Sequence, residues 1–219
     1  MAEHLHRQLH DLKQQVVYVG SLVEAALAKA IRALTTRDDR IAREVIQSDD
    51  EIDRMEVTVE ENCLEILALY QPVALDLRFV VAVLKINNDL ERIGDLAKNI
   101  AKRVVTLAPL RTIDVPDDFE PMARVAQRMV KGSLDALVNS NTLLARQVRA
   151  MDQEVDDHRD QIESYVKGCI TERPDQAQAL LQLSSIARHI ERLADMATHV
   201  AEEVIYMVEG DIVRHRAGA

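Results

Sequence analysis

The 219-residue sequence has few of the residues that interrupt helices or build disulfide frameworks. It contains six glycines, five prolines, two cysteines and no tryptophan, and aromatic residues make up only 3%. Cys63 and Cys169 fall inside helical patterns and form no Cys-x-x-Cys pair, so we expect reduced core thiols rather than a disulfide. A chain rich in Leu, Ala, Glu, Arg and Val with so few helix breakers is predicted to be all-α.

Long apolar runs, positive charge and catalytic motifs are also scarce. The longest apolar run, Phe79 to Leu84, is far too short to span a bilayer, and the first residues show no basic and apolar leader. We therefore expect a cytoplasmic protein. The formal net charge of −10 disfavours nucleic acid as a partner and favours a cation. A Gly-rich phosphate loop and recognisable Ser-His-Asp or Cys-His arrangements are missing, and we expect that the protein is not an enzyme.

Apolar residues at intervals of three and four predict six long amphipathic helices. The first covers residues 6–36 and the second ends at Gln71, and the others cover 73–106, 119–139, 143–172 and 175–209. Asp38 and Asp39 offer an N-cap for the second helix. Pro72 and Pro174 each divide one helix from the next, because proline disfavours helix in the preceding residue and fits the first turn that follows.

The two halves of the chain repeat one another. The second and fifth helices align at an offset of 103 residues, and the third and sixth align at an offset of 100. We therefore expect two tandem three-helix bundles, in residues 1–106 and 119–209. Residues 107–118, with Pro109 and Pro116, form the expected linker, and residues 210–219 form an expected flexible tail.

A pair of carboxylates recurs in the two halves. Glu91-Arg92-Ile93-Gly94-Asp95 returns one hundred residues later as Glu191-Arg192-Leu193-Ala194-Asp195. The two acids of each copy are four residues apart, about one helical turn, so both point the same way and can hold a cation between them. Acids at this spacing also commonly just solvate a helix or pair with arginine, for which Arg54, Arg92 and Arg192 are candidates.

Further acids on the preceding helices complete the pattern. If these helices pack antiparallel, Asp49 and Asp53 approach the first pair, and Asp152 and Asp156 approach the second. Clustered acids repel unless cations neutralise them, and carboxylates with an occasional His suit Mg²⁺, Mn²⁺, iron or Zn²⁺. The candidate metal ligands are Asp49, Asp53, Glu91, Asp95, Asp152, Asp156, Glu191, Asp195 and His199. Because His199 of the second half corresponds to Asn99 of the first, we expect two sites of unequal affinity on an accessible face.

These features resemble the PhoU family of bacterial phosphate-signalling regulators over about residues 5–209. The resemblance is carried by Pro72-Val73-Ala74-Leu75-Asp76-Leu77-Arg78, by Asp89-Leu90-Glu91-Arg92-Ile93-Gly94-Asp95 and by Ile190-Glu191-Arg192-Leu193-Ala194-Asp195. The second half departs from the first of these segments, because it has Pro174-Asp175-Gln176-Ala177-Gln178.

The resemblance implies two three-helix bundles with multinuclear iron or zinc clusters on Asp49, Asp53, Glu91 and Asp95 and on Asp152, Asp156, Glu191 and Asp195. It implies a negative regulator of phosphate uptake and of the phosphate-starvation response. Its implied partners are the ATPase subunit of the high-affinity phosphate ABC transporter and a membrane sensor histidine kinase, which would bring the protein to the inner face of the membrane. We also expect a homodimer.

Two alternatives remain at this point. A ferritin-like di-iron carboxylate enzyme would also be helical and rich in acids, but that class uses paired Glu-x-x-His motifs. The only such motif here is Glu3 to His6, near the N-terminus. The other alternative is a metal-free helical adaptor.

Overall fold

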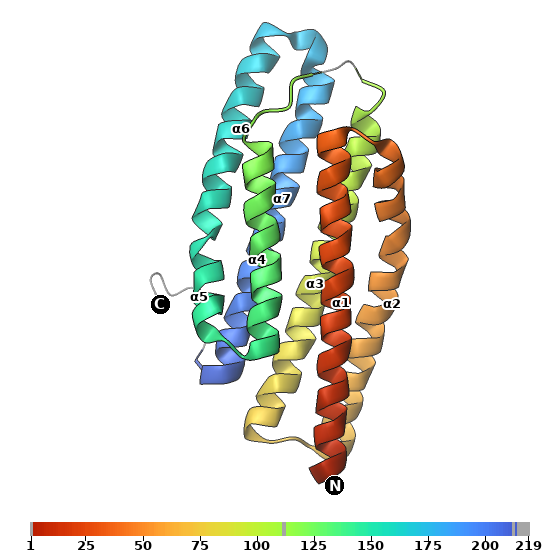
Figure 1. Ribbon diagram of the computed structural model, residues 1–219, viewed down its shortest axis with the longest axis vertical. Coiled ribbons are helices and arrows are strands. Elements are labelled where there is room, and N and C mark those ends of the chain that lie inside the picture. Colours follow the sequence, from red (N-terminus) through yellow and green to blue (C-terminus); the bar gives the residue numbers. More distant parts are fainter. Residues whose placement is uncertain (1, 111–112, 212, 214–219) are drawn as a thin grey trace.

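The chain forms long helices that lie side by side along one axis in the computed structural model, which describes residues 2–110, 113–211 and 213 (Figure 1). The elements are α1 (Ala2–Thr36), α2 (Asp39–Tyr70), α3 (Ala74–Leu107), α4 (Phe119–Asn139), α5 (Thr142–Ala150), α6 (Asp152–Glu172), the 3₁₀ turn η1 (Pro174–Gln176) and α7 (Ala177–Glu209). The described ranges contain no strand, and the predicted all-α class is confirmed.

The helix ends follow the local chemistry of the sequence. Asp38 caps α2, and its side chain accepts a hydrogen bond of 3.0 Å from the backbone N–H of Arg40. Gln71 then takes a left-handed conformation with φ of 45°, and Pro72 follows it, so α2 ends where the sequence predicts. Pro174 opens the 3₁₀ turn that precedes α7.

The expected fifth helix is interrupted at Met151, which separates α5 from α6. The backbone N–H of Met151 donates to Val148, and that of Glu154 donates to Met151, both over three residues rather than four. The backbone is therefore wound more tightly for one turn, as in a 3₁₀ helix, and Asp152 becomes the first residue of a new helix. No glycine or proline marks this position, so the sequence pattern gave no sign of it.

The helices form two units that pack through their last helices. α1, α2 and α3 contact one another, α4, α5 and α6 pack on α7, and the most extensive contact joins α3 to α7. In Figure 1 these two helices lie along the middle of the molecule, between α2 and α6. Each therefore has one face in its own unit and another in the junction between units, which explains why the core runs through both units without a break.

The two cysteines are free thiols, as the sequence predicts. Cys63 is fully buried in α2, and burial raises the pKa of its thiol to about 12. The thiolate is the reactive form of cysteine, so Cys63 acts as an inert core residue.

Within the described ranges, no helix is long and apolar enough to cross a membrane. The tail expected from residue 210 onward lies mostly outside the described residues; of the three tail residues that are described, Val213 is buried.

Candidate metal centres on the two repeats

The antiparallel packing of α2 against α3 brings four predicted acids of the first repeat together. Burial raises the pKa of Glu91, and the negative charges of Asp95, Asp53 and Asp49 raise it further. Burial and the charge of Asp49 likewise raise the pKa of Asp53. This first cluster, made of Asp49, Asp53, Glu91 and Asp95, therefore exists as the sequence predicts, with carboxylates from two helices facing one another.

A lysine enters the first cluster from α3. The ammonium of Lys98 donates a hydrogen bond to Asp49 and lies 3.7 Å from the carboxylate of Asp95. Its bond to Asp49 raises the pKa of Lys98, and the charges of Asp95 and Asp53 act in the same direction. Lys98 is thus a cation that belongs to the chain itself and lies among the four acids.

The second repeat assembles the corresponding acids, which we call the second cluster. Burial raises the pKa of Asp152, and the charges of Asp195 and Asp156 raise it further. The pKa values of Asp195 and Glu191 are raised for the same reason, first by burial and then by a neighbouring aspartate. Asp152, Asp156, Glu191 and Asp195 therefore share one region of strong negative potential.

The internal partners of the second cluster differ from those of the first. Thr198 stands at the position of Lys98, and its hydroxyl lies 3.4 Å from Asp152. Among the described residues, the cation in direct contact with the second cluster is Arg159, which stands at the position of Glu56 and lies 3.4 Å from Asp156 and 3.3 Å from Asp160. The neutral hydroxyl of Thr198 thus replaces the ammonium of Lys98. The guanidinium of Arg159 is shared between Asp156, a member of the cluster, and Asp160, which lies outside it.

The acids of the first cluster lie at different depths. The side chain of Asp95 is 50% exposed, as expected for a Glu-x-x-x-Asp copy on an accessible face, whereas that of Asp49 on the preceding helix is only 3% exposed. Arg54 was a candidate counter-ion, but its guanidinium donates to the backbone carbonyl of Asp50. The spacing of Lys98, three residues after Asp95, could have indicated the true partner, as could that of Arg159, three residues after Asp156.

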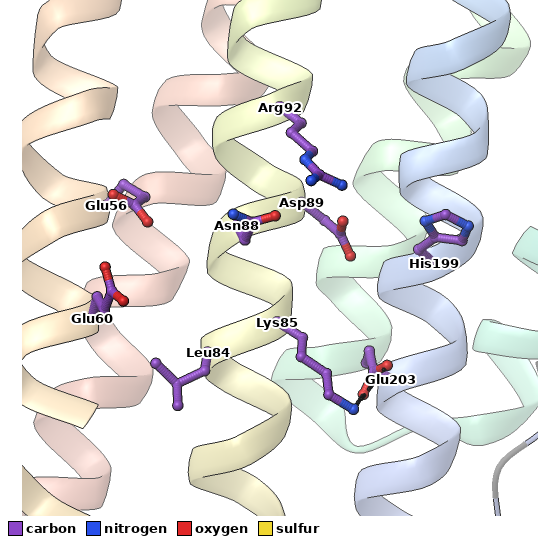
Figure 2. A pocket seen from close by; sticks show the side chains of 9 residues that line it. All are labelled: Glu56, Glu60, Leu84, Lys85, Asn88, Asp89, Arg92, His199 and Glu203. Carbon is purple, nitrogen blue, oxygen red and sulfur yellow. Dashed lines mark hydrogen bonds and ion pairs between the residues drawn. The ribbon is translucent and has the colours of Figure 1, made fainter. Parts of the chain in front are cut away.

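His199 lies at the edge of the second cluster and lines a groove between the repeats. Its charge lowers the pKa of Asp152 and of Asp195, against the larger effect of burial. Figure 2 shows its ring on α7, across from Asp89 and Arg92 of α3. The groove has a volume of about 700 Å³, and an ion pair of 3.1 Å between Lys85 and Glu203 closes one end. His199 is therefore shared between the cluster and the groove.

Arg92 and Arg192 line a hollow of about 400 Å³ between α3 and α7, together with Asp95 and Asn99. The two arginines were expected to orient the acids or to pair with a neighbouring helix. Both are exposed, and they come from equivalent positions of the two repeats. The α3–α7 junction thus brings the two motif copies to a common surface.

Gly94 allows α2 to approach α3 closely beside the first cluster. A Cβ atom at this position would lie 3.0 Å from Cδ1 of Ile52 and 3.9 Å from a carboxylate oxygen of Asp49. In the second repeat Ala194 replaces Gly94, and Val155 replaces Ile52. Ala194 adds a methyl group relative to Gly94, and Val155 lacks one relative to Ile52, so the two helices can approach closely in both repeats.

The donor chemistry of both clusters suits a hard or borderline cation, because carboxylate oxygens come from two helices at once. Their present geometry is not a finished coordination sphere: across the described residues, no three His, Cys, Asp or Glu side chains converge on one cation position. In the described part of the second cluster, a cation would displace the contacts of Thr198 with Asp152 and of Arg159 with Asp156. The first cluster does not fit a cation unless Lys98 leaves.

Two similar three-helix units, each with acids from two helices facing one another, define a duplicated all-α protein with paired acidic sites. The PhoU domain model matches this chain twice, over residues 16–104 and 119–204, and the chain belongs to the PhoU family. The resemblance stated from the motifs is thereby confirmed.

Relatives match the chain along nearly its whole length. A phosphate-specific transport system accessory protein PhoU homolog of Aquifex aeolicus is 40% identical over 212 residues, covering 97% of this chain and 96% of that protein. The crystal structure of PhoU from Pseudomonas aeruginosa superposes with a TM-score of 0.90 at 32% identity and covers 94% of this chain and 99% of that one. That of the phosphate transport system regulatory protein PhoU from Streptococcus pneumoniae gives 0.88 at 28% identity, covering 95% and 99%. PhoU proteins are accessory and regulatory proteins rather than enzymes.

Proposed function

We propose that this protein is an accessory regulator of phosphate transport that represses phosphate uptake and the phosphate-starvation response when phosphate is plentiful. The observation that carries the proposal is the match along both repeats to accessory proteins of the phosphate-specific transport system. Because fold alone does not determine function, the near-complete coverage and the retained motif copies matter more than the helical architecture.

In this proposal the protein connects two membrane-bound partners at the inner face of the membrane. One is the ATPase subunit of the phosphate ABC transporter, and the other is a sensor histidine kinase. The long α3–α7 junction offers a continuous surface with exposed arginines from both motif copies. Such a surface suits protein partners, since arginine is enriched where proteins meet. We further propose that the protein acts as a homodimer.

Metal binding by the acidic clusters is the second part of the proposal. The ligands would be Asp152, Asp156, Glu191, Asp195 and His199 in the second repeat and, once Lys98 has left them, Asp49, Asp53, Glu91 and Asp95 in the first. Iron or zinc clusters are proposed by family resemblance, and the oxygen-rich donor sets also suit Mg²⁺ or Mn²⁺. A bound cation would supply positive charge and invert the local acidic potential, so that the same surface could receive an anionic group of a partner.

The regulatory role is tested in a strain of the source organism that lacks the gene. We expect phosphate uptake and starvation-gene expression to remain high in rich phosphate, and the plasmid-borne wild-type gene to restore repression. Normal uptake together with normal gene expression in the deletion strain would refute the role. Co-purification with the transporter ATPase and with the kinase, each from membranes of the complemented strain, tests the two partners separately.

The metal role is tested on untagged protein, because an added histidine tag binds metal itself. Bound metals are measured by mass spectrometry in the wild type, in the double variant Glu91→Ala/Asp95→Ala and in Glu191→Ala/Asp195→Ala. Loss of metal in at least one double variant supports the sites. Equal and negligible metal in all three proteins would favour the metal-free adaptor. The di-iron enzyme has no support in the relatives, which are named as accessory and regulatory proteins.

A further inference from the structure

We propose that Lys98 takes the place of a metal ion in the first repeat, so that a divalent cation binds selectively at the second cluster. This inference rests on the proposed metal role of the acidic clusters. It departs from the expectation of one metal site in each repeat, because the two clusters differ in the cation that the chain already provides.

The Lys98 ammonium already occupies the first cluster. It contacts Asp49 directly and lies 3.7 Å from Asp95. Asp49 is nearly inaccessible, and a buried carboxylate without a partner costs free energy. Lys98 is itself only 23% exposed, so it is held within the cluster rather than pointing into solvent. A metal ion that used Asp49 would have to expel this ammonium.

The residue that contacts the equivalent acid differs in the second repeat. Thr198 replaces Lys98, and its hydroxyl contributes no positive charge to Asp152. Asp152 therefore receives a hydroxyl where Asp49 receives an ammonium, and a cation that used Asp152 would have no ammonium to expel. A divalent cation gains most where its charge is not already supplied by the protein.

Arg159 contacts the second cluster but also has a partner outside it. It lies 3.4 Å from Asp156 and 3.3 Å from Asp160, which is not a cluster member. Arg159 can keep its contact with Asp160 while Asp156 turns toward a bound cation. Among the described residues, the ion pairs of Lys98 stay within the first cluster, so its displacement costs more than that of Arg159.

The two positions also permit a reciprocal test. Lys98→Thr gives the first repeat the residue of the second, and Thr198→Lys gives the second repeat the residue of the first. Lys102→Thr is the matched control, because Lys102 is exposed on the same helix one turn further on and contacts neither cluster in the described structure. Asp95→Asn and Asp195→Asn identify the repeat that holds the metal.

The experiment titrates metal-stripped, untagged protein with Mn²⁺ and follows binding by calorimetry and by the electron paramagnetic resonance signal of free Mn²⁺. We expect wild-type binding to be lost in Asp195→Asn and kept in Asp95→Asn. Thr198→Lys should weaken binding by about tenfold or more, and Lys98→Thr should add binding that Asp95→Asn removes. Lys102→Thr should bind as the wild type does.

A measurement without metal tests Lys98 independently. Lys98→Thr should lower the midpoint of thermal unfolding in the presence of a chelator, whereas Lys102→Thr should not. If Lys98→Thr does not fold, Thr198→Lys still decides the question, because it adds a cation to an acidic cluster and should not destabilise the fold.

Equal binding at both repeats in the wild type would overturn this inference and leave the metal role intact. Binding that depends on Asp95 but not on Asp195 would also overturn it. If neither the wild type nor Lys98→Thr bound Mn²⁺, zinc or iron, the metal role and this inference would both fail, although the regulatory role would stand on its own test.

Discussion

Lys85 of α3 reaches across the junction between the repeats and forms an ion pair of 3.1 Å with Glu203 of α7. The Glu203 side chain is only 4% exposed, whereas that of Lys85 is 40% exposed and its ammonium lies 5.1 Å from the centre of the Tyr206 ring. The pair therefore joins the two units where their last helices pack most extensively, and it supplies positive charge to a carboxylate that is almost removed from water.

Replacing Lys85 by methionine should destabilise the protein by about 1–3 kcal/mol, because Glu203 loses a charged partner while remaining buried. The free energy of unfolding is measured in urea for Lys85→Met, Glu203→Gln and the double variant. We expect the double variant to lose less than the sum of the single variants. Strict additivity would show that the two side chains do not interact in solution.

The close approach at Gly94 predicts coupling between two residues on different helices. Gly94→Ala gains about 1 kcal/mol of helix propensity but presses a methyl group on Ile52, so its net effect in the wild type is small or unfavourable. In an Ile52→Val background the methyl group has room, as it does in the second repeat, where Ala194 and Val155 stand at these positions.

We therefore expect Gly94→Ala to be more favourable by about 1 kcal/mol in the Ile52→Val background than in the wild type. Urea unfolding of the four proteins measures the coupling. An identical effect of Gly94→Ala in both backgrounds would contradict the proposed contact.

The second cluster should make the metal-free protein less stable as the pH rises. The folded-state pKa values of Asp152, Glu191 and Asp195 are raised, chiefly by burial, above the ordinary carboxyl value of about 4. Between the ordinary and the raised values, the folded chain retains protons that the unfolded chain has released. The contribution of these groups to stability is therefore greatest below the ordinary pKa and is lost as the pH rises through the raised one.

This pH dependence is measured as a difference, because other carboxylates such as Asp38 have lowered pKa values and act in the opposite direction. Urea unfolding with a chelator is recorded between about pH 4 and pH 8 for the wild type and Asp152→Asn. We expect the variant to gain stability relative to the wild type as the pH rises. A difference that does not change with pH would contradict the raised pKa of Asp152.

Gly210 should tolerate no side chain, because it ends α7 with a φ of 81° and a Cβ atom there would overlap the guanidinium of Arg78. Gly210→Ala should lower stability by about 1–2 kcal/mol. Gly168→Ala is the matched control: it lies on the exposed side of α6 with no atom within 4 Å of an added Cβ, and it should raise stability by about 0.5–1 kcal/mol. Equal effects of the two substitutions in thermal unfolding would refute this account of the α7 terminus.

The helices and the duplication can be predicted from local patterns in the amino-acid sequence. Apolar spacing, the Asp38 cap and the prolines at 72 and 174 act over a few residues, so their consequences can be read locally. The recurrence of Glu91 and Asp95 as Glu191 and Asp195 identified one acidic helix in each repeat. The expected antiparallel packing then predicted that acids of the preceding helix lie near each pair.

Which cation contacts each cluster, and how deeply its acids are buried, depends on how the helices pack. The depth of Asp49, the entry of Lys98 and the contact of Arg159 with Asp156 depend on how closely two helices approach and on the rotation of each about its axis. The pairing of α3 with α7 depends in the same way on contacts between distant segments. Because Thr198 and Arg159 stand in the second repeat where Lys98 and Glu56 stand in the first, similar helix packing gave the two repeats of one motif different electrostatics.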